Sequence, residues 1–214
     1  MKALLAEFIG TLFLVATVVG SGIMAVQLTD DVGLQLLINS LATGGILIAM
    51  IVALQSISAD FNPAVTLVAV ALKRTPARAA IGLIAAQIAG GIAGTVLANL
   101  MFNLDAITWS DHERSGGGLW LGEAVATFGL VLVIFALLQA GRDAAVAYGV
   151  AAYIVAAYWF TSSTSFANPA VAVARMFTDT FAGIDPASVA MFVLMQLTGA
   201  ALALLTIRIL WEKP

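Results

Sequence analysis

The 214-residue chain contains no cysteine, and this absence excludes several kinds of chemistry at once. Without a thiol the chain has no disulfide, no thiolate nucleophile and no cysteine-ligated metal, and the redox compartment is not readable from the sequence. Histidine is nearly absent too, since His112 stands alone in an acidic loop. A zinc site would need further ligands that this loop does not provide. We therefore expect His112 to be solvated, and we expect no metal and no cofactor.

Charged side chains are also scarce, at 10% of the residues, whereas hydrophobic residues make up 62% and the mean hydropathy is +1.05. Such a chain has too little polar surface to coat a soluble globule, which indicates an integral membrane protein. Because a span needs about 20 mostly apolar residues, the sequence predicts an all-α membrane protein with six transmembrane helices. These cover approximately residues 3–27, 33–55, 79–102, 118–140, 144–162 and 187–210.

The few charges are distributed unevenly between the two sides that six spans define. One side receives most of the basic residues, namely Lys2, Lys73, Arg74, Arg78, Arg142, Arg208 and Lys213. The other receives Asp30, Asp31, Asp105, Asp111, Glu113, Asp179 and Asp185, with only Arg114 and Arg175 as basic residues. By the positive-inside rule we expect a multi-pass protein of the inner (plasma) membrane with both termini in the cytoplasm. The first apolar run is long and contains Glu7, so we expect a span there and not a cleaved signal.

The tripeptide Asn-Pro-Ala occurs twice, at Asn62-Pro63-Ala64 and at Asn168-Pro169-Ala170, in stretches too short to cross a bilayer. Proline fits the first turn of a helix because its missing N–H is no loss there, and a preceding asparagine serves as N-cap. Each tripeptide therefore predicts the start of a half-length helix. Two such helices bring their N-termini and polar side chains to the bilayer midplane.

The two halves repeat the same order of polar residues, which is Glu7, Asn-Pro-Ala and Gln87 in the first and Glu123, Asn-Pro-Ala and Gln196 in the second. Since each half holds three spans, the second half must enter the membrane from the opposite face, which predicts an inverted repeat. We take residues 1–214 as a single transmembrane channel domain, with repeat 1 at about 1–103 and repeat 2 at about 116–214.

Glu7 and Glu123 lie inside predicted spans, where an unpaired charge would be costly. We expect them to be structural, accepting hydrogen bonds from the irregular backbone of the re-entrant loops, and we expect the same of Gln87 and Gln196. The alternative is a coupled secondary transporter of a small solute in which Glu7 or Glu123 carries protons.

At this point the residues resemble a known family. The segments Ala6-Glu7-Phe8-Ile9-Gly10-Thr11 and Phe61-Asn62-Pro63-Ala64-Val65-Thr66, with the second Asn-Pro-Ala, are similar to signatures of the aquaporin, or major intrinsic protein, family. The resemblance covers essentially the whole chain. It implies six tilted helices, two re-entrant half-helices, a pore in each subunit and a homotetramer.

We expect the pore to act through the two half-helices, since each presents roughly half a positive charge at its N-terminus and repels cations there. Asn62 and Asn168 would direct amide N–H groups toward a passing oxygen. The expected partners are water, small neutral solutes and the lipid bilayer, and no nucleic acid. No nucleophile, base and oxyanion donor form a recognisable set, so we do not expect an enzyme.

One position departs from the water-selective members of the family, which are similar in having an arginine directly after the second Asn-Pro-Ala. Here that residue is Val171. Counting along each half places Thr43, Ala156 and Ser165 at the other positions of the selectivity filter.

This wider, less charged ring favours glycerol, urea or undissociated metalloid acids such as arsenous acid (arsenite). Val171 and Thr43 resemble a bacterial branch associated with arsenic resistance, which is said to pass arsenous acid and methylated arsenicals. The alternative is that Tyr158, Trp159 or Phe160 swings in and restores a tight filter.

Two charged residues are candidates for the vestibules. Arg175 lies four residues after Val171, on the same helix face, and would place a positive charge in the outer vestibule. Alternatively it caps the half-helix or pairs with Asp179. Asp60 would line the inner vestibule and oppose anions, unless it forms a salt bridge with Lys73 or Arg74.

Overall fold

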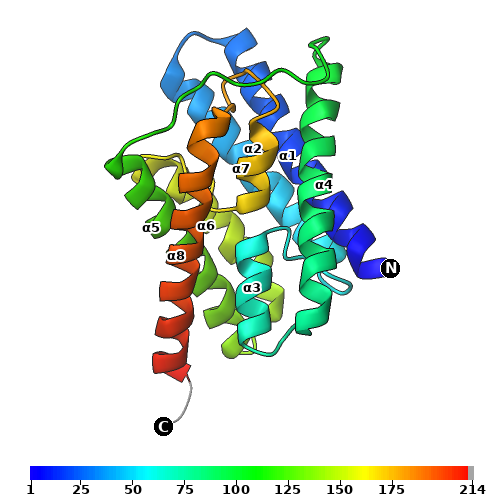
Figure 1. The fold of residues 1–214 in the computed structure, drawn as a ribbon, viewed down its shortest axis with the longest axis vertical. Coiled ribbons are helices and arrows are strands. Elements are labelled where there is room, and N and C mark those ends of the chain that lie inside the picture. The colour runs from blue at the N-terminus through cyan, green and yellow to red at the C-terminus, as the bar shows by residue number, and fades with distance from the viewer. Residues whose placement is uncertain (212–214) are drawn as a thin grey trace.

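The computed structural model describes residues 1–211 and is all-α within them (Figure 1). Among these residues, six helices are long and apolar enough to cross a membrane, and they agree with the six predicted spans to within a few residues. The predicted fold class is confirmed. The elements in chain order are α1 (Lys2–Leu28), α2 (Val32–Leu54), α3 (Pro63–Ala71), α4 (Ala77–Met101), α5 (Gly117–Gln139), the 3-10 turn η1 (Asp143–Ala145), α6 (Val146–Phe160), α7 (Pro169–Arg175) and α8 (Pro186–Trp211).

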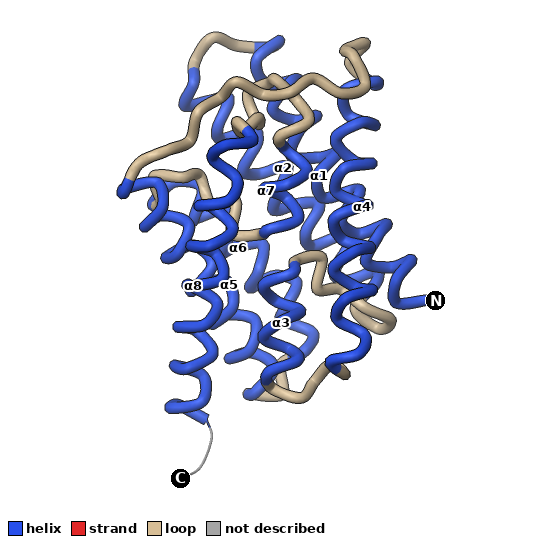
Figure 2. The backbone as a smooth tube through the Cα atoms, in the orientation of Figure 1, coloured by secondary structure: helices blue, strands red, loops and turns tan. Residues whose placement is uncertain are grey.

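The short helices α3 and α7 begin at Pro63 and Pro169, as the two Asn-Pro-Ala tripeptides predict. Non-helical chain leads into each of them from a preceding long helix (Figure 2). In Figure 1, α7 lies above α3, and the two run in opposite directions away from the level at which they begin. The half-helices thus start inside the bundle, and neither is an interruption of a full-length span.

The first and third long helices of each half pack in the same way, α1 against α4 and α5 against α8. Glycine makes this close packing possible. A Cβ added at Gly90 of α4 would lie 2.3 Å from the carbonyl oxygen of Phe8, and one added at Gly199 of α8 would lie 2.2 Å from that of Ala124. Both distances are far below van der Waals contact, so only glycine allows these backbones to approach so closely.

We name the two ends of the molecule after the orientation that the charges predict. The inner end carries Gln55 and Asp143, and the outer end carries Tyr158 and Arg175. The loop between α4 and α5 crosses the outer end (Figure 1). Lys213, one of the basic residues assigned to the inner side, lies outside the described residues.

Candidate functional site

The two asparagines of the repeated tripeptide have nearly identical geometry. Asn62 has φ −155° and ψ 117°, and Asn168 has φ −158° and ψ 114°. Each side-chain oxygen accepts a hydrogen bond of 2.9 Å from the backbone N–H two residues on, at Ala64 and at Ala170, so both asparagines are N-caps. Capping fixes the amide and leaves its NH₂ group free to point away from the helix.

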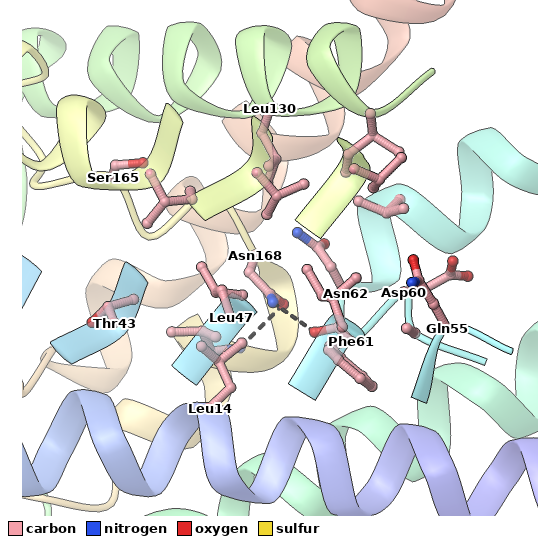
Figure 3. Close-up of a pocket in the computed structure, with 18 of the residues that line it drawn as sticks. Leu14, Thr43, Leu47, Gln55, Asp60, Phe61, Asn62, Leu130, Ser165 and Asn168 are labelled. Atoms are coloured by element: carbon pink, nitrogen blue, oxygen red, sulfur yellow. Dashed lines mark hydrogen bonds between the residues drawn. The ribbon is translucent and has the colours of Figure 1, made fainter. Parts of the chain in front are cut away.

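These NH₂ groups reach across to the opposite loop. Asn62 Nδ2 donates to the carbonyl oxygen of Ala167 at 2.7 Å, and Asn168 Nδ2 donates to that of Phe61, also at 2.7 Å. The second of these bonds is drawn in Figure 3. Each hydrogen bond therefore joins one half of the chain to the other at the point where α3 and α7 begin. One N–H of each amide remains after this bond.

The acceptor carbonyls are turned toward the asparagines by an unusual backbone conformation. Phe61 has φ 48° and Ala167 has φ 49°, in the left-handed region that side chains other than glycine rarely adopt. Such a residue costs about 1–3 kcal/mol and persists only where its surroundings hold it. The surroundings that hold these two residues are the buried glutamates.

Glu7 is fully buried and satisfies the loop before α3. Its Oε1 accepts from Ser58 Oγ at 2.5 Å and from the N–H of Asp60 at 2.9 Å, and its Oε2 accepts from the N–H of Phe61 at 2.7 Å. Gln87 Nε2 donates to the same Oε2 at 2.8 Å. With these four donors, the Glu7 side chain serves as a hydrogen-bond acceptor for loop backbone that has no water to bind.

Glu123 does the same for the loop before α7. It is fully buried, its Oε1 accepts from the N–H of Phe166 at 2.9 Å, and its Oε2 accepts from the N–H of Ala167 at 3.0 Å and from Gln196 Nε2 at 2.5 Å. Neither glutamate is among the residues that line the central cavity. This geometry is what the structural interpretation requires, and it gives a transported proton no direct access to either carboxylate.

A cavity of about 400 Å³ runs past the two asparagines. In Figure 3, Thr43 and Ser165 lie on one side of the asparagine pair, and Asp60 and Gln55 lie on the other. Most of its wall is apolar and comes from rows of residues four apart on the long helices, which therefore share one helix face. These rows are Leu14 and Val18 on α1, Thr43, Leu47 and Ile51 on α2, Leu130, Ile134 and Leu138 on α5, and Val146, Val150, Ile154 and Tyr158 on α6.

Three of the four predicted filter residues line the outer part of this cavity, namely Thr43, Ser165 and Val171. Ala156 does not, and its assignment to the filter is wrong in this structure. It is an exposed residue that lines a separate shallow depression on the outside of α2 and α6. The α6 residues in the cavity are Ile154 and Tyr158, two positions to either side. Since each residue turns a helix by about 100°, an error of two positions moves a side chain to the opposite face.

Of the three aromatic residues named in the alternative, Tyr158 lines the cavity on the α6 face where Ala156 was expected. Thr43 Oγ1 donates to the carbonyl oxygen of Asn39 at 2.8 Å, and it lies 3.0 Å from the Tyr158 hydroxyl. Because a threonine hydroxyl has one hydrogen, Tyr158 is the donor to Thr43. Trp159 and Phe160 are exposed and do not line the cavity. The four-residue row from Val146 is the signal in the sequence that could have identified Tyr158.

Arg175 also lines the cavity, although only 4% of its surface is exposed. Its Nε donates to the carbonyl oxygen of Ala182, and its guanidinium carbon lies 3.5 Å from the centroid of the Phe166 ring. The alternative ion pair with Asp179 is absent among the described residues, since Asp179 instead accepts weakly from Ser110 Oγ and from the N–H of Asp111, at 3.4 and 3.3 Å.

Asp60 lines the inner part of the cavity with Gln55 and Asp143. Its carboxylate accepts from Thr66 Oγ1 at 2.8 Å. Neither Lys73 nor Arg74 forms an ion pair with it in the part of the chain that the structure describes. This position in the cavity lining is the one that the vestibule hypothesis requires.

His112 lies in the loop over the outer end, with its carbonyl oxygen accepting from the N–H of Asp185 at 2.9 Å. Partial burial, and after it the charges of Arg114 and Arg175, lower the pKa of His112. No group of three or more His, Cys, Asp or Glu residues that could hold a metal ion occurs within residues 1–211.

Comparison with known proteins gives the same family as the sequence motifs. The family model described as "Major intrinsic protein" matches residues 1–145, which is more than half of the chain. The chain belongs to the major intrinsic protein family. It is 52% identical over 204 residues to aquaglyceroporin AqpS of Rhizobium meliloti (strain 1021), with 95% of this chain and 87% of that protein covered. The fold is similar to the X-ray structure of the aquaglyceroporin from Plasmodium falciparum, with a TM-score of 0.76 at 18% identity, covering 95% of this chain and 93% of that one.

Membership of this family makes the chain a multi-pass membrane protein of a channel family and not of an enzyme family.

Proposed function

We propose that this major intrinsic protein is a passive channel for water and small uncharged solutes, and that solutes cross it through the cavity beside Asn62 and Asn168. The observation that carries the proposal is the reciprocal pair of Asn Nδ2 to carbonyl bonds, each 2.7 Å long, at the side of that cavity. The positive ends of α3 and α7 meet there and repel cations. The remaining amide N–H groups offer hydrogen bonds to a passing oxygen.

We infer that the pathway is wide enough for glycerol, urea and undissociated metalloid acids such as arsenous acid, with methylated arsenicals as a further candidate class. Val171 supports this, because it lines the outer cavity where an arginine would narrow and charge the pore. Tyr158 lines the same cavity and its hydroxyl lies 3.0 Å from Thr43 Oγ1, so Thr43, Tyr158, Ser165 and Val171 are the proposed filter. The name of the AqpS relative, an aquaglyceroporin, favours the same class of solute.

Several further expectations remain part of this proposal. We infer a single channel domain of two inverted repeats, a homotetramer, and an inner-membrane location with both termini in the cytoplasm. Arg175 and Asp60 are the proposed outer and inner vestibule residues. Glu7 and Glu123 are proposed to be structural because they accept hydrogen bonds from the re-entrant loops, and Gln87 and Gln196 because they donate hydrogen bonds to these two glutamates.

The proposal is tested by stopped-flow light scattering of proteoliposomes with water, glycerol, urea and arsenous acid in parallel. We expect water and at least glycerol to cross faster than in empty liposomes. Val171→Arg should reduce glycerol and urea flux by about tenfold or more, since it places bulk and a charge in the lining, whereas the matched variant Val171→Leu should retain most of it. Passage of water with exclusion of every larger solute by the unmodified protein would refute the wide filter.

A further inference from the structure

The outer end of the cavity holds a buried positive charge whose hydrogen-bonding capacity is only partly used. Arg175 Nε donates to Ala182, and Phe166 covers one face of the guanidinium. For its two terminal nitrogens the structure records no hydrogen bond within residues 1–211, and no carboxylate there forms an ion pair with Arg175. Burying an unpaired charge is expensive, so a partner inside the cavity would be favoured.

A second guanidinium reinforces this charge. Arg114 lies on the same ring, 5.1 Å from the Phe166 centroid, and its Nε donates to the carbonyl oxygen of Gly183 at 2.9 Å. The carboxylate that attracts both arginines is Glu123, but its oxygens accept from three donors and do not line the cavity. Two positive charges against one occupied carboxylate leave the surroundings of Phe166, at the outer end of the cavity, positive.

The uncharged polar groups around Arg175 add a hydrogen-bond donor. The Thr43 hydroxyl donates its only hydrogen to the carbonyl oxygen of Asn39, and the Tyr158 hydroxyl donates its only hydrogen to Thr43 Oγ1. Ser165 is different, since its hydroxyl is buried without any partner among the described residues while the residue lines this cavity (Figure 3). The free donors are therefore the terminal N–H groups of Arg175 and the O–H of Ser165, a set that suits the oxygens of an anion.

The lining of the cavity has the opposite sign at its inner end. Asp60 and Asp143 line the cavity there, and the described part of the chain places no lysine or arginine in the cavity lining other than Arg175. An anion attracted to the outer end would meet two carboxylates before it could leave on the inner side. We propose that Arg175 and Ser165 form an outer anion site, which binds a small singly charged oxyanion and thereby obstructs the passage of uncharged solutes from the outer side.

This proposal rests on the proposed channel function for its flux readout, so the test has a second readout that needs no flux. The probe is methanesulfonate, a compact oxyanion that stays charged at all ordinary pH values. Dimethyl sulfone, which has nearly the same shape and no charge, is the control solute. Binding of ¹⁴C-labelled methanesulfonate to the detergent-purified protein is measured directly. Glycerol flux into right-side-out vesicles is measured with either compound added outside, with sodium gluconate balancing the salt.

We expect methanesulfonate to bind and to inhibit glycerol flux when added outside, and dimethyl sulfone to do neither. Arg175→Gln should weaken binding by about tenfold or more, as expected for a charged hydrogen bond, and Ser165→Ala by about threefold. Arg175→Lys keeps the charge and should retain part of the binding. Each variant's inhibition is compared with its own anion-free flux, and Ser165→Ala serves as the informative variant if Arg175→Gln does not fold.

Absence of methanesulfonate binding to a protein that conducts glycerol would overturn the anion site and leave the channel intact. Equal binding by the wild type, Arg175→Gln and Ser165→Ala would also overturn it. Uptake of labelled methanesulfonate through the protein would overturn the claim that the anion obstructs the pore. Arg175-dependent binding without glycerol flux would support the site and refute the proposed channel.

Discussion

The substitution Glu123→Gln separates a structural carboxylate from a proton carrier. In the native protein this fully buried side chain accepts hydrogen bonds from Phe166, Ala167 and Gln196. Glutamine has one acceptor oxygen, and its NH₂ group would face an N–H donor, so at least one buried donor loses its acceptor. A hydrogen bond to a charged group is worth about 1.5–3 kcal/mol. Ala167, held at φ 49°, would also lose part of its restraint.

We therefore expect Glu123→Gln to lower the free energy of unfolding by about 3 kcal/mol and the melting temperature in detergent by about 6–12 °C. Fluorescence-detected size-exclusion chromatography after heating measures the shift. Glu113→Gln is the matched control, because Glu113 is exposed in the outer loop and should melt as the wild type does. A Glu123→Gln protein that melts like the wild type but loses uptake driven by a proton gradient would refute the reasoning and favour the transporter.

Two further substitutions test the packing and the filter. Gly199→Ala places a Cβ 2.2 Å from the carbonyl oxygen of Ala124, so we expect overpacking to lower the free energy of unfolding by about 1–3 kcal/mol. Gly118→Ala is the control and should leave the melting temperature unchanged, because its added Cβ would have no described neighbour within 4 Å. Equal melting temperatures of the two variants would contradict the close packing of α5 and α8. Tyr158→Phe removes the hydroxyl that donates to Thr43 and makes the outer cavity slightly wider. Stopped-flow measurements should therefore show a higher ratio of glycerol to water flux, and an unchanged ratio would exclude Tyr158 from the filter.

The parts of the fold that depend on local chemistry were predictable from the sequence. Pro63 and Pro169 begin helices where the rules of N-capping place them, and the long apolar runs form the six membrane-length helices. The duplicated order of Glu, Asn and Gln also indicated which polar residues form the hydrogen-bond networks that support the re-entrant loops, because a repeated sequence pattern indicates repeated contacts.

The features that depend on the rotation of a helix about its axis, or on contacts between distant segments, were not predictable from the sequence. Ala156 was placed in the filter by counting, yet only the packing of α6 decides which of its faces meets the cavity, and that face carries Tyr158. Arg175 was expected either in the vestibule or at Asp179, because sequence spacing gives no sign of Phe166 beneath it or of the Ala182 carbonyl beside it.

The central claim of this account is passive passage of uncharged solutes along the cavity beside Asn62 and Asn168, and glycerol counterflow tests it most directly. Proteoliposomes are loaded with a high concentration of unlabelled glycerol, and labelled glycerol is added outside. For a passive channel, the label should rise to equilibrium without exceeding it, and the initial rate should increase in proportion to the gradient. Transient accumulation of label above equilibrium would show a carrier that alternates between two sides, and would contradict the account.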